Sequence, residues 1–212
     1  MTNIKEKYCK KLLVEGNDDQ HVIWALCDRR QITGAFDVVD CEGINNLLRQ
    51  FPIRLKLPTD KINTLGIIVD ADIDLKNRWD SIRNILQNNG FAVPDKLPSE
   101  GLIITHPENG KKVGVWIMPN NNLNGMLEDF ITFLIPQDDK LLPVVDETLK
   151  RIERDRLNHC KHQSKVKIYT WLAWQEEPGK PLGQSITMKY LTTDEETCLK
   201  LMDWLKKLFS DG

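Results

Sequence analysis

Short apolar runs and amphipathic stretches alternate along the first half of the chain. Apolar runs of strand length occupy residues 8–14, 36–41 and 64–69, and apolar positions at helical spacing follow each of them. The third run, TLGIIV, is apolar at nearly every position, as expected for a strand that is buried on both faces. Three strand–helix units in succession predict an α/β fold, a three-layer sandwich around a mainly parallel sheet.

Boundary signals accompany these units. Asn17-Asp18-Asp19 supplies a helix N-cap and an acidic first turn, Pro52 ends or kinks the second helix, and Gly90 caps the third. We assign three tryptophans of this part of the chain to the core: Trp24, Trp79 and Trp116.

The second half of the chain begins with a predicted hairpin and then becomes helical. Residues 101–105 and 112–118 read as strands joined by a Pro-Glu-Asn-Gly turn. Residues 166–174 fit a helix or a strand, with a helix favoured, and 194–209 form the clearest amphipathic helix, preceded by a Thr-Thr-Asp cap. We therefore expect an α/β core over residues 1–135 and a mostly helical C-terminal layer over 136–212, packed on that core.

Composition narrows the class of protein. The chain has 212 residues, 41% hydrophobic and 28% charged, with a formal net charge of −2, so no global basic field indicates a nucleic-acid partner. Five cysteines without a CxxC pair indicate reduced thiols. The N-terminus lacks the apolar run of a signal peptide, and no apolar run reaches the roughly 18 residues that span a bilayer. We expect a soluble, cytoplasmic protein without a membrane partner.

Carboxylates follow two of the predicted strands. Glu15 comes after the first strand, and Asp70, Asp72 and Asp74 come after the third. The carboxyl ends of parallel strands share one edge of a sheet, where ligands bind, so these acids are expected to converge. Crowded carboxylates need a cation to stay ionised, and oxygen ligands without His or Cys favour Mg²⁺ or Mn²⁺. The alternative is that these acids have no role beyond capping helices, and Asp74 by itself could cap the helix that follows.

Two segments together carry a family resemblance. LLVEGNDD, followed by LGIIVDADID, resembles the Toprim fold of topoisomerases, bacterial primases, recombination-mediator proteins and the overcoming-lysogenization-defect (OLD) nucleases. The family motif is a Glu-Gly after the first strand and a DxD or DxDxD after the third. The resemblance covers about residues 8–130 and is closest to small, stand-alone Toprim-like bacterial proteins of unassigned function.

The resemblance implies roles for individual acids. Glu15 matches the glutamate proposed as a general acid or base, or as a metal ligand. Asp70 and Asp72 match the metal-binding pair, and Asp74 the optional third acid. Asp19 matches an extra carboxylate of the OLD-type nucleases.

The sequence lacks several features of the better-known Toprim families, which limits the activities that the resemblance implies. No separate domain with a nucleophilic tyrosine, no Cys/His zinc module and no GxxxxGK[ST] phosphate loop is present. A further acid, Glu128, opens a later predicted helix, although the helix dipole alone favours glutamate there. The leading hypothesis is Mg²⁺- or Mn²⁺-dependent hydrolysis of DNA or RNA, in nucleic-acid processing or anti-phage defence. The alternatives are a non-catalytic binding or assembly module, and a metal-dependent phosphohydrolase or nucleotidyl transferase acting on a small nucleotide.

A basic stretch lies in the predicted helical layer. Residues 150–167 contain seven Lys and Arg against two acids, with candidate nucleic-acid contacts at Arg151, Arg154, Lys161 and Lys165. A solvated helix face is the commoner explanation for such a run. The sequence also leaves open a protein partner and a homodimer, the commonest oligomer.

Overall fold

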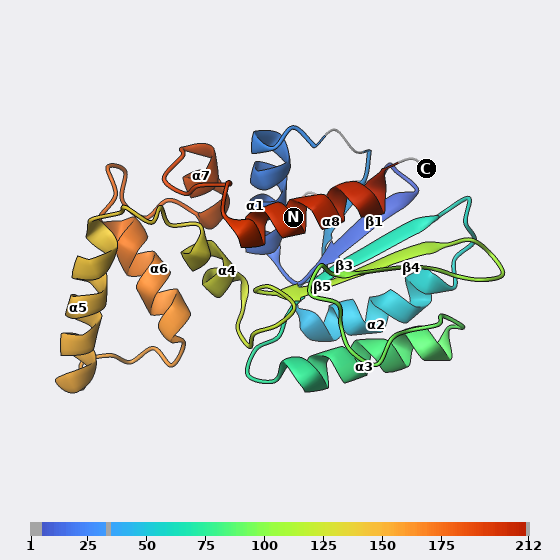
Figure 1. Ribbon diagram of the computed structural model, residues 1–212, viewed down its shortest axis with the longest axis horizontal. Coiled ribbons are helices and arrows are strands. Elements are labelled where there is room, and N and C mark those ends of the chain that lie inside the picture. The colour runs from blue at the N-terminus through green and yellow to red at the C-terminus, as the bar shows by residue number, and fades with distance from the viewer. Residues whose placement is uncertain (1–5, 33–34, 211–212) are drawn as a thin grey trace.

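The computed structural model describes residues 6–32 and 35–210, and its centre is a five-stranded sheet (Figure 1). The strands are β1 (Lys10–Val14), β2 (Asp37–Asp40), β3 (Thr64–Asp70), β4 (Leu102–Thr105) and β5 (Lys112–Met118). The helices are α1 (Asn17–Arg29), α2 (Ile44–Leu55), α3 (Leu75–Asn88), α4 (Leu127–Phe133), α5 (Leu141–Arg154), α6 (Gln163–Ala173), α7 (Leu182–Thr187) and α8 (Glu196–Phe209).

The strand order is β2-β1-β3-β5-β4. All pairs are parallel except β4 with β5, which form the expected antiparallel hairpin. The chain leaves β1 toward β2 on one side, and leaves β3 toward β4 and then β5 on the other. The neighbouring carboxyl ends of β1 and β3 therefore form a topological switch point, the place where open α/β sheets bind ligands.

Apolar side chains on the two faces of the sheet form two separate clusters. Leu12 and Val14 of β1 belong to the cluster covered by α1 and α8, whereas Leu13 belongs to the cluster covered by α2 and α3. Figure 1 shows α8 crossing one face of the sheet, with α2 and α3 beneath the other. The predicted α/β sandwich with a mainly parallel sheet and an added helical layer is confirmed.

Two glycines allow α8 to lie close to the sheet. Gly66 of β3 and Gly114 of β5 are register partners. A Cβ at Gly114 would lie 2.6 Å from the Leu208 side chain of α8, and one at Gly66 would lie 2.8 Å from it. Larger residues at either position would push α8 away from the sheet.

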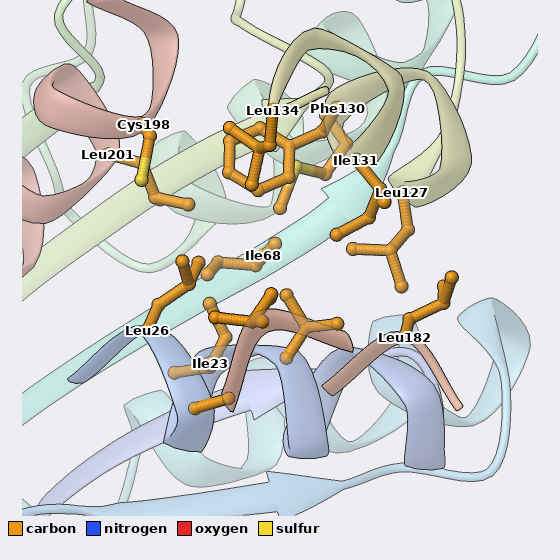
Figure 2. Close-up of a cluster of buried hydrophobic side chains, with 14 of the residues drawn as sticks. Ile23, Leu26, Ile68, Leu127, Phe130, Ile131, Leu134, Leu182, Cys198 and Leu201 are labelled. Carbon is orange, nitrogen blue, oxygen red and sulfur yellow. The ribbon is translucent and has the colours of Figure 1, made fainter. Parts of the chain in front are cut away.

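The cluster on the α1 and α8 side also fixes α4. Figure 2 shows α4 side chains packing over Ile68 of β3, opposite side chains of α1 and α7. The residues labelled there are Ile23, Leu26, Ile68, Leu127, Phe130, Ile131, Leu134, Leu182, Cys198 and Leu201. This packing sets the first turn of α4 against the carboxyl end of β3.

The described part of the C-terminal segment, residues 136–210, is mostly helical, as expected, but its helices occupy different places. α8 packs on the sheet, whereas α5 and α6 lie side by side beyond the carboxyl ends of the parallel strands (Figure 1). The stretch 166–174 is helical, as favoured from the sequence. Within the described ranges, no helix is both long and apolar enough to cross a membrane.

Several local predictions were wrong. α2 continues through Pro52 to Leu55, because a stabilising apolar face outweighs the one carbonyl bond that proline removes. The residue that caps α8 is Glu195, without a side-chain bond, so the Thr-Thr-Asp cap does not form. Trp24, assigned to the core, is 38% exposed, because it lies on the outer face of α1 and stacks edge-on with His21.

Candidate functional site

The pair Glu15 and Asp70 forms the base of the candidate site. Glu15 directly follows β1, and Asp70 is the last residue of β3, its parallel neighbour. The Asp70 backbone N–H donates a 2.8 Å hydrogen bond to Glu15 Oε1, which orients the glutamate across the strand ends. The predicted convergence of these two acids is thus present in the structure.

Asp19 lies on the first turn of α1, beside this pair. The N-cap of α1 is Gly16 rather than Asn17, and Gly16 N–H donates a 3.1 Å hydrogen bond back to Asp19 Oδ2. Asp19 is only 8% exposed, and its Oδ1 has no hydrogen-bond partner among the described residues. An unpartnered buried carboxylate oxygen is energetically costly and indicates a missing ligand.

Glu128, on the first turn of α4, is the fourth acid of the group. The N–H of Leu127 donates a 3.0 Å hydrogen bond to Asp70 Oδ1, so the start of α4 is tied to the end of β3. Glu128 is 5% exposed, and Lys165 Nζ from α6 lies 3.3 Å from its Oε1. Helix α6 therefore contributes a cation to the site, whose base lies at the carboxyl ends of the strands.

These side chains line one cavity of about 420 Å³. Its lining has seven acids and a single cation, Lys165; the acids are Glu15, Asp18, Asp19, Asp40, Glu42, Asp70 and Glu128. We call this cavity the acid pocket. A second cavity, of about 440 Å³, is lined by residues that include Lys56, His106 and Asn109 and by no carboxylate.

Burial and mutual repulsion make three carboxylates of the acid pocket, those of Glu15, Asp19 and Asp70, hard to ionise. Burial, with the charges of Asp19, Glu15 and Glu128, raises the pKa of Asp70 to about 9. Burial and the charge of Glu15 raise the pKa of Asp19 to about 7, and burial raises the pKa of Glu15 as well. A bound cation would reverse these shifts, because it favours the charged form of each acid.

The donor set fits a hard divalent cation. Glu15, Asp19 and Asp70 each accept a backbone N–H on one carboxylate oxygen, and no described residue hydrogen-bonds to the other oxygen. Across residues 6–32 and 35–210, however, no three His, Cys, Asp or Glu side chains are already arranged around a metal position. The pocket therefore presents oriented oxygen ligands but not a closed coordination shell.

The other two acids of the DADID segment lie elsewhere. Asp74 caps α3 by accepting the Asn77 N–H at 3.0 Å. Helix capping is the alternative role that the sequence indicates for this residue. Asp72 has φ of 53° and pairs with Arg78, whose Nη2 lies 2.7 Å from its Oδ2. Arg78 Nε also donates to the Asp70 carbonyl. Neither Asp72 nor Asp74 lines the acid pocket.

The predicted nucleic-acid contacts divide into two groups. Lys165 lines the acid pocket, whereas Arg151, Arg154 and Lys161 are exposed at the outer end of α5 and in the connection to α6. The residues expected from the sequence pattern did not include Asp40 and the neighbouring Glu42, which reach the pocket because β2 is the other neighbour of β1. Their signal was available, since Asp40 also ends a strand.

The comparisons with known proteins place the chain in a family. A family model described as "Protein of unknown function (DUF3226)" matches residues 9–210. The chain belongs to this family. The DUF3226 match runs from β1 to α8 and includes every residue of the acid pocket. No curated protein and no solved structure matches the chain.

Proposed function

We propose that this DUF3226 protein is a Toprim-type enzyme that hydrolyses phosphodiester bonds of nucleic acid with Mg²⁺ or Mn²⁺. The observation that supports it most is the set of three oriented carboxylates, Glu15, Asp19 and Asp70, at the β1–β3 switch point, with Asp19 Oδ1 buried and without a hydrogen-bond partner among the described residues. Their order along the chain, Glu-Gly after the first strand and DxD after the third, matches the motif of that family.

Glu15, Asp70 and Glu128 would hold the cation. When bound there, the ion would polarise the phosphodiester and lower the pKa of a water molecule. The backbone N–H groups of Asp70 and Leu127 orient two of these carboxylates, and binding would bring them and Glu128 together around the ion.

Asp19 is the best placed residue to accept a proton from the attacking water. Its unpartnered Oδ1 is buried at the pocket, and a pKa of about 7 suits a general base that works near neutral pH. Lys165 is the one cation in the pocket lining, and its Nζ would neutralise a non-bridging phosphate oxygen. Both residues act from helices anchored to the sheet.

The test is a titration with Mg²⁺ and Mn²⁺, read by calorimetry and thermal shift, on the wild type, Asp70→Asn and Asp74→Asn. We expect the wild type and Asp74→Asn to bind and be stabilised by the ion, and Asp70→Asn to lose at least 10-fold in affinity. Asp74 is the matched control, because it belongs to the same DADID segment but lies outside the pocket.

The same three proteins are then assayed on labelled DNA and RNA, single- and double-stranded. Cleavage by the wild type and Asp74→Asn that is absent in Asp70→Asn supports the proposal. A wild type that binds neither ion refutes it. Metal binding with hydrolysis of free nucleotides only would favour the small-substrate alternative.

A further inference from the structure

The cations of residues 150–167 are concentrated on one exposed part of the fold. This segment, which we call the basic arm, comprises the end of α5, the connection 155–162 and the start of α6. It contains seven Lys and Arg against Glu153 and Asp155, in a chain whose net charge is −2. Figure 1 shows α5 and α6 beyond the edge of the sheet where the strands end.

Three of the seven cations, Lys150, Arg156 and Lys161, form no ion pair with a described residue, and two others share one carboxylate. Arg151 and Arg154 share one carboxylate, Asp155, at 3.9 and 3.2 Å. Arg156 and Lys161 are exposed and form no ion pair with any described residue. Unpaired, solvent-exposed cations of this kind are available to phosphate groups.

The α6 end of the basic arm is anchored beside the acid pocket. Ser164 Oγ donates to Asp129 Oδ1 on α4, and Lys167 pairs with Asp146 of α5 at 2.8 Å. The buried side chains of Ile168 and Trp171 join the rest of α6 to the main apolar cluster. The arm therefore begins at a helix that packs on the folded core, next to the pocket that Lys165 lines.

The unpaired cations of the basic arm lie close in the sequence to the residue that the arm contributes to the acid pocket. Lys165 lines the acid pocket, and Lys161 precedes it by four residues, so the two Cα atoms lie at most about 14 Å apart. At about 3.4 Å of axis per nucleotide, a strand of about four nucleotides covers that greatest distance. A strand that leaves the pocket along this segment would pass Lys161 and Arg156.

We propose that the basic arm binds the phosphate backbone of a polynucleotide strand and leads it to the acid pocket, so that the substrate is a polymer. This inference rests on the proposed function for the identity of the reaction, but it concerns a different surface. DNA and RNA share the phosphodiester chemistry that the arm would recognise, and both are used as probes.

The decisive variant is Arg154→Gln/Arg156→Gln/Lys161→Gln, which removes three cations of the arm and none from the pocket. Its matched control is Lys56→Gln/Lys61→Gln/Lys206→Gln, which removes three exposed cations of other segments. Circular dichroism and thermal melts establish that both proteins fold, and the single variants Arg156→Gln and Lys161→Gln replace the triple variant if it does not.

Binding is measured first without metal, in EDTA, by fluorescence anisotropy of 20-nucleotide DNA and RNA strands over a range of NaCl concentrations. We expect the arm variant to bind at least 10-fold more weakly than the wild type, and the slope of log K against log [NaCl] to fall by about 2. The control variant should stay within twofold. Equal binding by arm and control variants, or preference of the arm for anionic vesicles over oligonucleotides, overturns the proposal.

Hydrolysis is measured second, with Mg²⁺ or Mn²⁺, on the same strands and on bis(p-nitrophenyl) phosphate. The arm variant should lose at least 10-fold in kcat/KM on the strands and keep its rate on the small diester. Strand binding through the arm without any hydrolysis would refute the proposed function and support the arm. Hydrolysis of the small diester without arm-dependent strand binding would support the proposed function and refute the proposal for the arm.

Discussion

Replacing Asp19 by asparagine should stabilise the metal-free protein. Asp19 is almost completely buried and has one unpartnered oxygen, so its ionised form is unfavourable in the folded state. Asparagine has nearly the same shape, can still accept the Gly16 N–H through its amide oxygen, and cannot ionise. The substitution therefore removes a charge while preserving the hydrogen bond that begins α1.

The size of the effect follows from the pKa of Asp19, which burial and the charge of Glu15 raise from 3.8 to about 7. A raised carboxyl pKa destabilises the folded state at every pH above its unfolded value, and the penalty is complete only above the folded value. The difference corresponds to about 4 kcal/mol at pH 8 and about 2 kcal/mol at pH 5, since one pKa unit is worth about 1.4 kcal/mol.

The assay is urea unfolding in EDTA at pH 5 and pH 8, followed by circular dichroism. The gain in unfolding free energy for Asp19→Asn should be about 2–4 kcal/mol at pH 8 and clearly smaller at pH 5. Asp129→Asn is the matched control, because Asp129 accepts the Met126 N–H at α4 as Asp19 accepts Gly16 N–H, but its second oxygen is bonded to Ser164. We expect Asp129→Asn to be neutral or destabilising.

A destabilised Asp19→Asn protein at pH 8, or a gain that is the same at both pH values, would refute the reasoning. The first result would mean that the charge of Asp19 is compensated in the folded state. The second would mean that the gain does not come from ionisation. Excess Mg²⁺ should narrow the gap between the variant and the wild type if the ion occupies the acid pocket, since binding stabilises the folded wild type.

Three further substitutions test the packing that positions the site, each by urea unfolding. Gly114→Ala should cost about 1–3 kcal/mol, because the new methyl group would overlap the Leu208 side chain; no loss would mean that α8 shifts freely. Phe130→Ala should cost about 3–5 kcal/mol, since this fully buried ring anchors α4. Lys111→Met should cost about 1–3 kcal/mol, because buried Lys111 Nζ donates to the Leu55 carbonyl at the end of α2; an unchanged midpoint would contradict this.

The elements that were predictable are those whose signals are local. The run 64–69 is apolar at nearly every position and became β3, because such a run satisfies its backbone and side chains only inside a sheet. Glu15 and Asp70 could be brought together from the sequence because both follow strands, and parallel strands share an edge. The order β2-β1-β3-β5-β4 could not be derived, since it depends on contacts between segments far apart in the chain.

The acids of the motif also differ in whether local sequence signals could place them. Asp72 was expected beside Asp70 because alternate side chains of an extended strand face the same way, but β3 ends at Asp70. Asp72 then takes a left-handed backbone conformation in a bridge with Gly125, and Arg78 pairs with it. The cap of α1 was also misplaced: its N-cap is Gly16, whose N–H bonds to Asp19 Oδ2, and not Asn17.

The acid pocket is assembled from segments that no single motif contains. Its oriented carboxylates come from the ends of β1 and β3 and the start of α1, its fourth acid from α4, and its cation from α6. The hydrogen bond from Leu127 N–H to Asp70 and the ion pair between Lys165 and Glu128 link these segments in sequence, strand end to α4 and α4 to α6. Helix α4 therefore connects Asp70 of the acid pocket to α6, which carries part of the basic arm. For that reason we expect the arm and the pocket to act on one substrate strand and not as independent sites.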